Sequence, residues 1–162
     1  TAEGGLKITL YNINGLNPSS PSIDFLNEWF FKTMHHEFAH ILHQTKNYST
    51  DFNLISTDYQ GPSWLNLESD AVANKMGYVT CYASYSPDED FVEIISNYVT
   101  HAKGYWESVL ATAGEEGGDK LARKFEIVRN YLQESWGIDI DKLRDIVQKR
   151  SANISQLDLK TL

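Results

Sequence analysis

The spacing of hydrophobic residues changes early in the chain from a period of two to a period of about 3.6. Residues 6–11 alternate apolar and polar side chains and are rich in β-forming residues, which predicts one short strand with a buried face. Glycine, proline, asparagine and serine interrupt the pattern over residues 12–22. Between Phe25 and Gln44 apolar residues recur at helical spacing, and more hydrophobic side chains lie on other sides of the helix. A helix that is apolar nearly all round is typical of a central, buried position.

The middle of the chain predicts a loop, a helix and an extended segment. Residues 45–63 are polar and aromatic, which indicates a loop. Ser63 is a candidate N-cap for a helix that runs to Gly77, because glycine suits the position after a helix C-terminus. The β-branched and tyrosine-rich residues 77–86 predict an extended chain.

Helical patterns dominate the second half of the chain. Ser86 and Pro87, followed by acidic residues, predict a helix start, and the helical pattern continues toward Lys103. Further on, the sequence predicts a shorter helix over residues 104–113 and a glycine-rich break over residues 114–118. Two packing helices are then predicted, over residues 121–132 and 140–147. Since no repeat or linker divides the sequence, we expect residues 1–162 to form a single α+β, mostly helical domain.

The charge balance and the cysteine count exclude several classes of function. The chain has 14 Lys and Arg against 22 Asp and Glu, a formal net charge of −8, which disfavours nucleic acid and anionic membrane surfaces as partners. Cys81 is the single cysteine, so neither an intrachain disulfide nor a cysteine-based zinc cage can form. No apolar run approaches the roughly 20 residues that span a bilayer.

The motif His36-Glu37-Phe38-Ala39-His40, HExxH, lies within the predicted buried helix. Four helical positions advance the chain by about 400°, so both imidazoles project from one side and can reach one zinc ion. Glu37 lies about 100° round the helix, and in zinc hydrolases with this motif the glutamate contacts the metal-bound water. The motif therefore predicts a Zn²⁺ cofactor with Glu37 as general base. The alternative is a helix whose histidines are satisfied by ordinary packing.

A hydrolytic zinc site needs a third protein ligand and one open position. A regular helix places His43 about 10 Å farther along its axis than His36, too far for Zn–N bonds of about 2.1 Å. His43 is therefore expected to be a hydrogen-bonding or rim residue. Glu89 is the preferred third ligand, because Glu93 follows it at i,i+4 and can accept the spare N–H of a ligating histidine.

Alternatives to these assignments stay open. Ser86-x-x-Glu89 also matches a capping box, in which Glu89 bonds the backbone of Ser86. In that case Asp90 or His43 is the substitute ligand. Tyr82, seven residues before Glu89, is the candidate hydrogen-bond donor to the oxyanion of a tetrahedral intermediate, and its alternative is a packed aromatic residue.

Four segments of the sequence resemble one known family. They are HHEFAHILHQ at 35–44, GYVTCYAS at 77–84, EDFVEIIS at 89–96 and KFEIVRNYLQESWGIDIDKLRDIVQKR at 124–150. In these segments the chain is similar to the zinc-binding metallopeptidases that are also called substrate-import-associated zinc metallohydrolase lipoproteins. The resemblance implies a zincin-like catalytic domain that is the C-terminal part of a longer lipoprotein. It also implies a location in the cell envelope, beside nutrient-import proteins of the outer membrane, with a lipid anchor outside this chain.

The stretch from Tyr82 to Glu93 is also similar to lethal-factor-type toxin proteases, in the order and spacing of a tyrosine and two carboxylates. That likeness implies a role for each candidate: zinc ligands His36, His40 and Glu89, general base Glu37, oxyanion donor Tyr82, and Glu93 as support for a histidine.

These observations together predict a zinc metallopeptidase of the gluzincin type. A zinc-bound water would attack a peptide or glycoprotein substrate while Glu37 takes its proton. The cleft is expected between helices 30–43 and 88–100, with the strand 6–11 at its upper edge. The rival function is a non-catalytic glycan- or peptide-binding accessory module of an outer-membrane import system, and a metal-free helical scaffold is a third interpretation. Glu37 favours the enzyme, because a binding module needs no general base.

Overall fold

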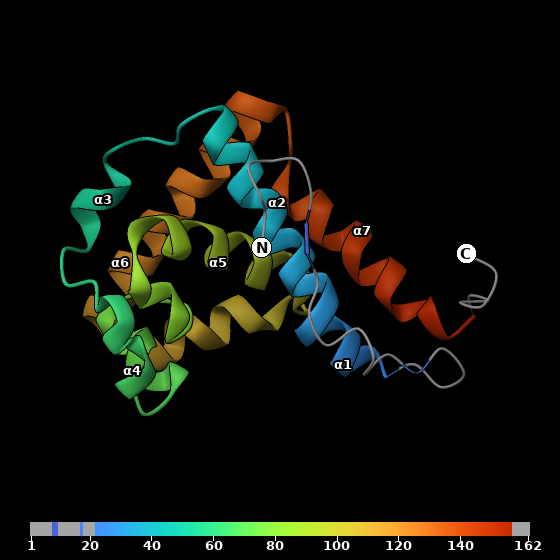
Figure 1. Ribbon diagram of the computed structural model, residues 1–162, viewed down its shortest axis with the longest axis horizontal. Coiled ribbons are helices and arrows are strands. Elements are labelled where there is room, and N and C mark those ends of the chain that lie inside the picture. Colours follow the sequence, from blue (N-terminus) through green and yellow to red (C-terminus); the bar gives the residue numbers. More distant parts are fainter. Residues whose placement is uncertain (1–7, 10–16, 18–21, 157–162) are drawn as a thin grey trace.

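The computed structural model describes residues 8, 9, 17 and 22–156, and in this part of the chain the protein is mostly helical (Figure 1). The helical elements, with 3-10 and π segments labelled η, are α1 Ile23–Leu26, η2 Asn27–Phe31, α2 Lys32–Thr45, α3 Phe52–Ile55, η3 Gly61–Asn66, α4 Asp70–Met76, η4 Tyr82–Tyr85, α5 Pro87–Thr100, α6 Gly104–Trp136, α7 Ile140–Ala152 and η5 Ile154–Gln156. None of the helices in the described ranges is long and apolar enough to cross a membrane.

The short N-terminal strand that the sequence predicts is not supported. Of residues 6–11 only Ile8 and Thr9 are described, and they form no strand, since Ile8 makes no more than an isolated bridge. The other positions of that segment lie outside the described residues. The α+β expectation therefore reduces to a helical fold over the part of the chain that the structure describes.

The HExxH helix is longer and less buried than the sequence predicts. Elements α1, η2 and α2 follow one another without a gap from Ile23 to Thr45, and the Ser22 hydroxyl caps the start by accepting from the Phe25 N–H. The expectation of a helix buried nearly all round is wrong, because Trp29, Met34 and Phe38 are about half exposed. Only one side of α2 packs against α5, so the hydrophobic residues on its other sides face outward.

The central helix of the fold is α5, not α2. Ser86 caps it as expected, with its hydroxyl accepting from the Glu89 N–H at 3.3 Å, and every residue from Asp90 to Thr100 is buried. Helices α2, α6 and α7 all pack against it, and Figure 1 shows α5 enclosed among them. The helix ends at Thr100 rather than near residue 103. Site residues on α5 are therefore held by the core itself.

The segment between α2 and α5 departs most from the prediction. A helix does end at Gly77, whose φ of 93° suits glycine, but it begins after Ser69 and not after Ser63. The segment 77–86, expected to be extended, contains the 3-10 turn η4, in which the Ser84 hydroxyl donates to the Cys81 carbonyl at 2.7 Å. The described residues offer no neighbouring strand to this segment, so its β-branched and aromatic side chains pack onto α5 instead.

The C-terminal helices follow the predicted pattern. The expected break lies within α6 at Gly114, whose φ of 71° and ψ of −162° are not helical and divide α6 into two helical parts joined at a kink. The glycine at 117 serves packing, since a Cβ there would lie 2.3 Å from the Asn74 carbonyl oxygen of α4. Helix α7 then packs against α5.

Candidate metal centre

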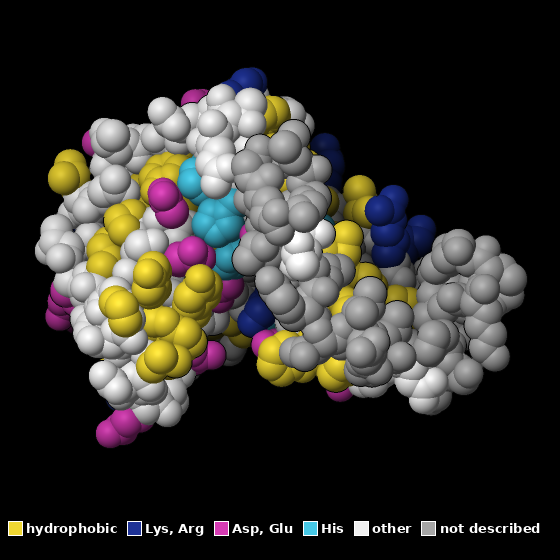
Figure 2. All heavy atoms as spheres, in the orientation of Figure 1, with side chains coloured by type: hydrophobic (Ala, Val, Ile, Leu, Met, Phe, Trp, Pro, Cys, Tyr) yellow, Lys and Arg dark blue, Asp and Glu magenta, His cyan; other side chains and the backbone are white. Residues whose placement is uncertain are grey.

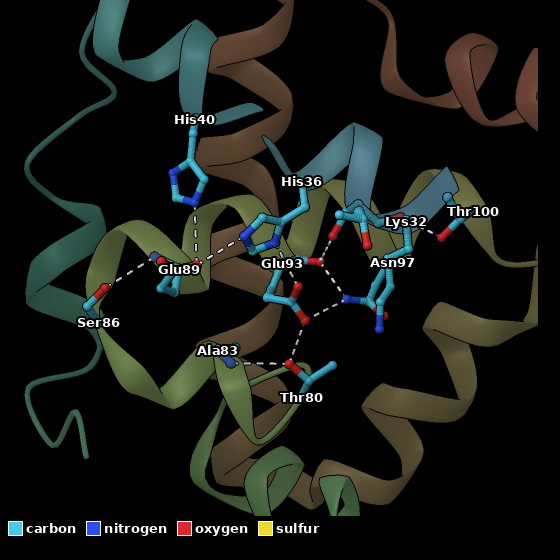
Figure 3. A network of polar contacts seen from close by, with 12 residues as sticks. Lys32, His36, His40, Thr80, Ala83, Ser86, Glu89, Glu93, Asn97 and Thr100 are labelled. Atoms are coloured by element: carbon cyan, nitrogen blue, oxygen red, sulfur yellow. Dashed lines mark hydrogen bonds and ion pairs between the residues drawn. The ribbon is translucent and has the colours of Figure 1, made fainter. Parts of the chain in front are cut away.

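Two histidines and one glutamate converge where α2 crosses α5. His36 and His40 project from the same side of α2, and Glu89 reaches them from the first turn of α5 (Figure 3). One ligand atom from each of the three side chains lies within 4.8 Å of the others. Glu89 Oε2 is 3.1 Å from His36 Nε2 and 3.4 Å from His40 Nε2. The structure thus brings together the three residues that the sequence predicts as ligands.

The environment of the Glu89 carboxylate fits a bound cation. Its Oε2 atom is buried and accepts no well-directed hydrogen bond from any described residue, although two imidazole nitrogens face it. An orphaned buried carboxylate oxygen is costly unless a cation satisfies it. Two imidazole nitrogens and one carboxylate oxygen form a donor set that zinc prefers, and three protein ligands leave a fourth position for water or substrate.

His36 is oriented by a buried network behind it. Its Nδ1 lies 2.8 Å from Glu93 Oε1, so the ring donates to Glu93 and presents Nε2 to Glu89. The Thr80 hydroxyl and the Asn97 amide donate to the other carboxylate oxygen of Glu93, at 2.7 Å and 3.1 Å. Figure 3 shows this network below the His36 ring. Glu93 therefore occupies the supporting position that the i,i+4 spacing suggests.

His36 and its two neighbouring carboxylates shift one another's pKa values. Burial by itself lowers the pKa of His36, but the close contacts of its ring with the carboxylates of Glu89 and Glu93 outweigh burial and raise the pKa to about 9. Burial raises the pKa of Glu89, yet the two histidines hold it well below its ordinary value. Zinc ligation requires the neutral imidazole, so a zinc ion held here would have to displace the proton that the two carboxylates favour on His36.

Glu93→Gln is expected to lower zinc affinity about 10–100-fold, because the new amide places an NH₂ donor among three donors that need a carboxylate acceptor. Competition titration against a chromophoric chelator measures the change. Glu107→Gln, an exposed acid on α6, is the matched control. Unchanged zinc affinity in a folded Glu93→Gln variant would show that His36 needs no support from Glu93.

His40 is supported by a second histidine instead of a carboxylate. His40 Nδ1 lies 2.9 Å from Nε2 of His43, a buried residue whose ring also meets Tyr48 and Phe91 edge to face. Burial lowers the pKa of His43, which favours the neutral ring that can accept from His40. This contact engages His43 Nε2 with His40 rather than with the Glu89 oxygen. The structure places His43 as a hydrogen-bonding residue.

Neither the capping box at Ser86 nor the substitute ligand Asp90 displaces Glu89 from the cluster. The capping interaction at Ser86 involves the Glu89 backbone N–H and leaves its carboxylate free to face the histidines. Asp90 is fully buried and forms an ion pair with Lys124 at 2.6 Å, while the Tyr59 hydroxyl donates to it at 2.9 Å. Asp90 thus points into the core, away from the ligand cluster.

Glu37 and Tyr82 lie beside the cluster, on the wall of a cavity of about 450 Å³ that His36 also lines. The Tyr82 ring stacks on the His36 ring at 5.9 Å between centroids. Burial and the nearby charge of Glu89 raise the pKa of Tyr82, so its hydroxyl stays protonated and able to donate. The cavity opens between α2 and the 3-10 turns η3 and η4, rather than between α2 and α5, which pack directly together.

The sequence interpretation missed the buried cation behind the site. Lys124 is fully buried, donates to the Gly77 carbonyl at 2.7 Å and lies 4.2 Å from the centre of the Tyr78 ring. It thereby links the end of α4 to Asp90, the residue after Glu89. The signal was present, because position 124 falls on the same helical stripe as the apolar residues Leu121, Phe125 and Val128.

Comparisons with known proteins agree with this geometry. A family model described as "Putative zinc-binding metallo-peptidase" matches residues 1–141. A crystal structure of a protein from Bacteroides caccae, described in the same words, is similar with a TM-score of 0.85 and 44% sequence identity. The match covers 98% of this chain and 60% of that one, so the chain spans only part of the length of that relative. No curated protein matches the sequence.

Proposed function

Because the chain belongs to the family of zinc-binding metallopeptidases, we propose that it is a zinc-dependent hydrolase of the gluzincin type that cleaves peptide bonds. The observation that carries the proposal is the convergence of His36, His40 and Glu89 beside a cavity lined by Glu37. The first three residues would hold zinc. When bound, zinc supplies a Lewis acid that lowers the pKa of a coordinated water toward about 7.

Other side chains of this protein transfer the proton, stabilise the oxyanion and orient the zinc ligands. Glu37 takes the proton of the attacking water and delivers it to the leaving amine, as general base and then general acid. Tyr82 donates its hydroxyl hydrogen to the carbonyl oxygen as negative charge develops there. Glu93 and His43 fix the orientations of His36 and His40 through the hydrogen bonds at their Nδ1 atoms.

Metal removal tests this function. Protein loaded with one equivalent of zinc is expected to cleave members of a proteome-derived peptide library, and dialysis against a chelator is expected to abolish cleavage until zinc is returned. Mass spectrometry of the new termini measures cleavage, and circular dichroism checks that the helices persist without metal. Cleavage that continues after the zinc has been removed would contradict the proposal. Stoichiometric zinc with no cleavage of any peptide would favour the non-catalytic binding module.

A further inference from the structure

The cavity beside the metal centre has the size of a ligand pocket. Its volume of about 450 Å³ falls within the range of small-molecule sites. It is bounded by η2 and α2 on one side and by η3, η4 and the start of α4 on the other. Since His36 and Glu37 form part of its wall, a group in this cavity lies next to the bond that the proposed enzyme cleaves.

Aromatic rings form much of the wall. Trp64 meets Tyr82 edge to face, with ring centroids 5.1 Å apart, and Tyr82 in turn stacks on His36. Trp29, 52% exposed, contributes from η2. Such rings can pack along an aliphatic stem and attract a cation over their faces. The wall alone therefore accepts either an apolar side chain or a long basic one.

Charge decides between these two occupants. Four acidic side chains and one lysine line the cavity, Glu28, Glu37, Asp70, Glu93 and Lys32. Lys32 is already paired with Glu28 at 3.0 Å, and Glu93 is engaged by His36. Asp70 accepts the Cys81 N–H at 2.7 Å through Oδ1 and has no cationic partner among the described residues. In Figure 2 acidic side chains lie close to the histidines, with a group of hydrophobic side chains beside them.

We propose that this cavity is the specificity subsite of the protein and takes the side chain of a lysine or arginine adjacent to the scissile bond of a peptide. The stem of the basic residue packs against Trp64 and Tyr82, and its charged end faces the carboxylate of Asp70. This inference rests on the proposed peptidase function and names its substrate class.

Matched peptides test the preference for a basic residue. The fluorogenic peptides of a pair differ only at the residue adjacent to the scissile bond, which is lysine in one and norleucine in the other, or arginine and citrulline. Because the two side chains of a pair have similar stems, the comparison measures the effect of the charge. We expect kcat/KM to be roughly five- to tenfold higher for the charged member of each pair. Asp70→Asn keeps the acceptor for the Cys81 N–H and is expected to reduce the ratio to about twofold. Asp119→Asn, an exposed acid on α6, is the control and keeps the full ratio.

A ratio near one in the wild type, or a preference for apolar or acidic residues, would overturn the subsite while leaving the peptidase function standing. An unchanged ratio in Asp70→Asn would also overturn it, since the discrimination would then come from elsewhere.

Cys81 provides a readout that does not depend on catalysis. It is the one cysteine of the chain, it is partly exposed, and it lines the same cavity. In the zinc-loaded Glu37→Gln variant, a saturating lysine peptide is expected to slow alkylation of Cys81 by iodoacetamide at least threefold more than its norleucine counterpart. Equal slowing by both peptides would contradict the inference. Selective protection without cleavage by the wild type would uphold the subsite and reject the peptidase.

Discussion

Replacing Glu37 with glutamine is expected to lower kcat by about a thousandfold while zinc remains bound. Glutamine has the same shape as glutamate but cannot take a proton from water, and general base catalysis contributes on the order of 10²–10⁴-fold. Glu37 belongs to the HExxH motif but not to the cluster of ligand atoms, so its loss should spare the metal. Steady-state cleavage of one peptide that the wild type cleaves in the proteome-derived library gives kcat, and elemental analysis of the same sample gives the zinc content.

The control for this variant is Glu134→Gln, an exposed acid near the end of α6. It should match the wild type in both measurements. If Glu37→Gln keeps zinc and cleaves as fast as the wild type, another group accepts the proton and the proposed mechanism fails.

Glu89→Gln is expected to weaken zinc binding by more than about 100-fold, a larger effect than the loss of a supporting residue. A neutral amide oxygen is a poorer zinc ligand than a carboxylate, and it removes the negative charge that two imidazoles face. Glutamine retains the backbone N–H that Ser86 caps, so helix α5 should form normally. Chelator competition gives the affinity, and thermal unfolding of both proteins verifies the fold.

The same experiment distinguishes Glu89 from the two alternative third ligands. If Glu89→Gln binds zinc as tightly as the wild type, the third ligand is another residue. Asp90→Asn and His43→Gln would then identify it. The present geometry instead predicts that Asp90→Asn perturbs the fold, because Asp90 holds the buried Lys124.

The ligand pair on α2 could be predicted because its geometry is local. Two histidines four positions apart share a side of any regular helix, whatever surrounds it. Glu89 and Glu93 could be predicted for the same reason once Ser86 and Pro87 had indicated the start of their helix. In each case the sequence predicts a helix, and the position of a residue on that helix determines the direction in which its side chain points.

Features that depend on distant neighbours could not be predicted. The exposure of Trp29 on η2 and of Phe38 on α2 depends on which side of this helix packs against the rest of the fold, and the spacing of apolar residues does not reveal that side. The turn at Tyr82 forms where β-branched residues suggested extended chain, because no strand among the described residues pairs with it. The ion pair between Lys124 and Asp90 joins residues 34 positions apart and depends on how α6 crosses α5.

Zinc anomalous scattering tests the convergence of the three side chains most directly. Crystals of the zinc-loaded protein, measured on both sides of the zinc absorption edge, should show one strong peak bonded to Nε2 of His36, Nε2 of His40 and a carboxylate oxygen of Glu89, each at about 2.0–2.2 Å. A peak at other residues, or Glu89 turned away from a zinc ion held by the two histidines, would contradict the account.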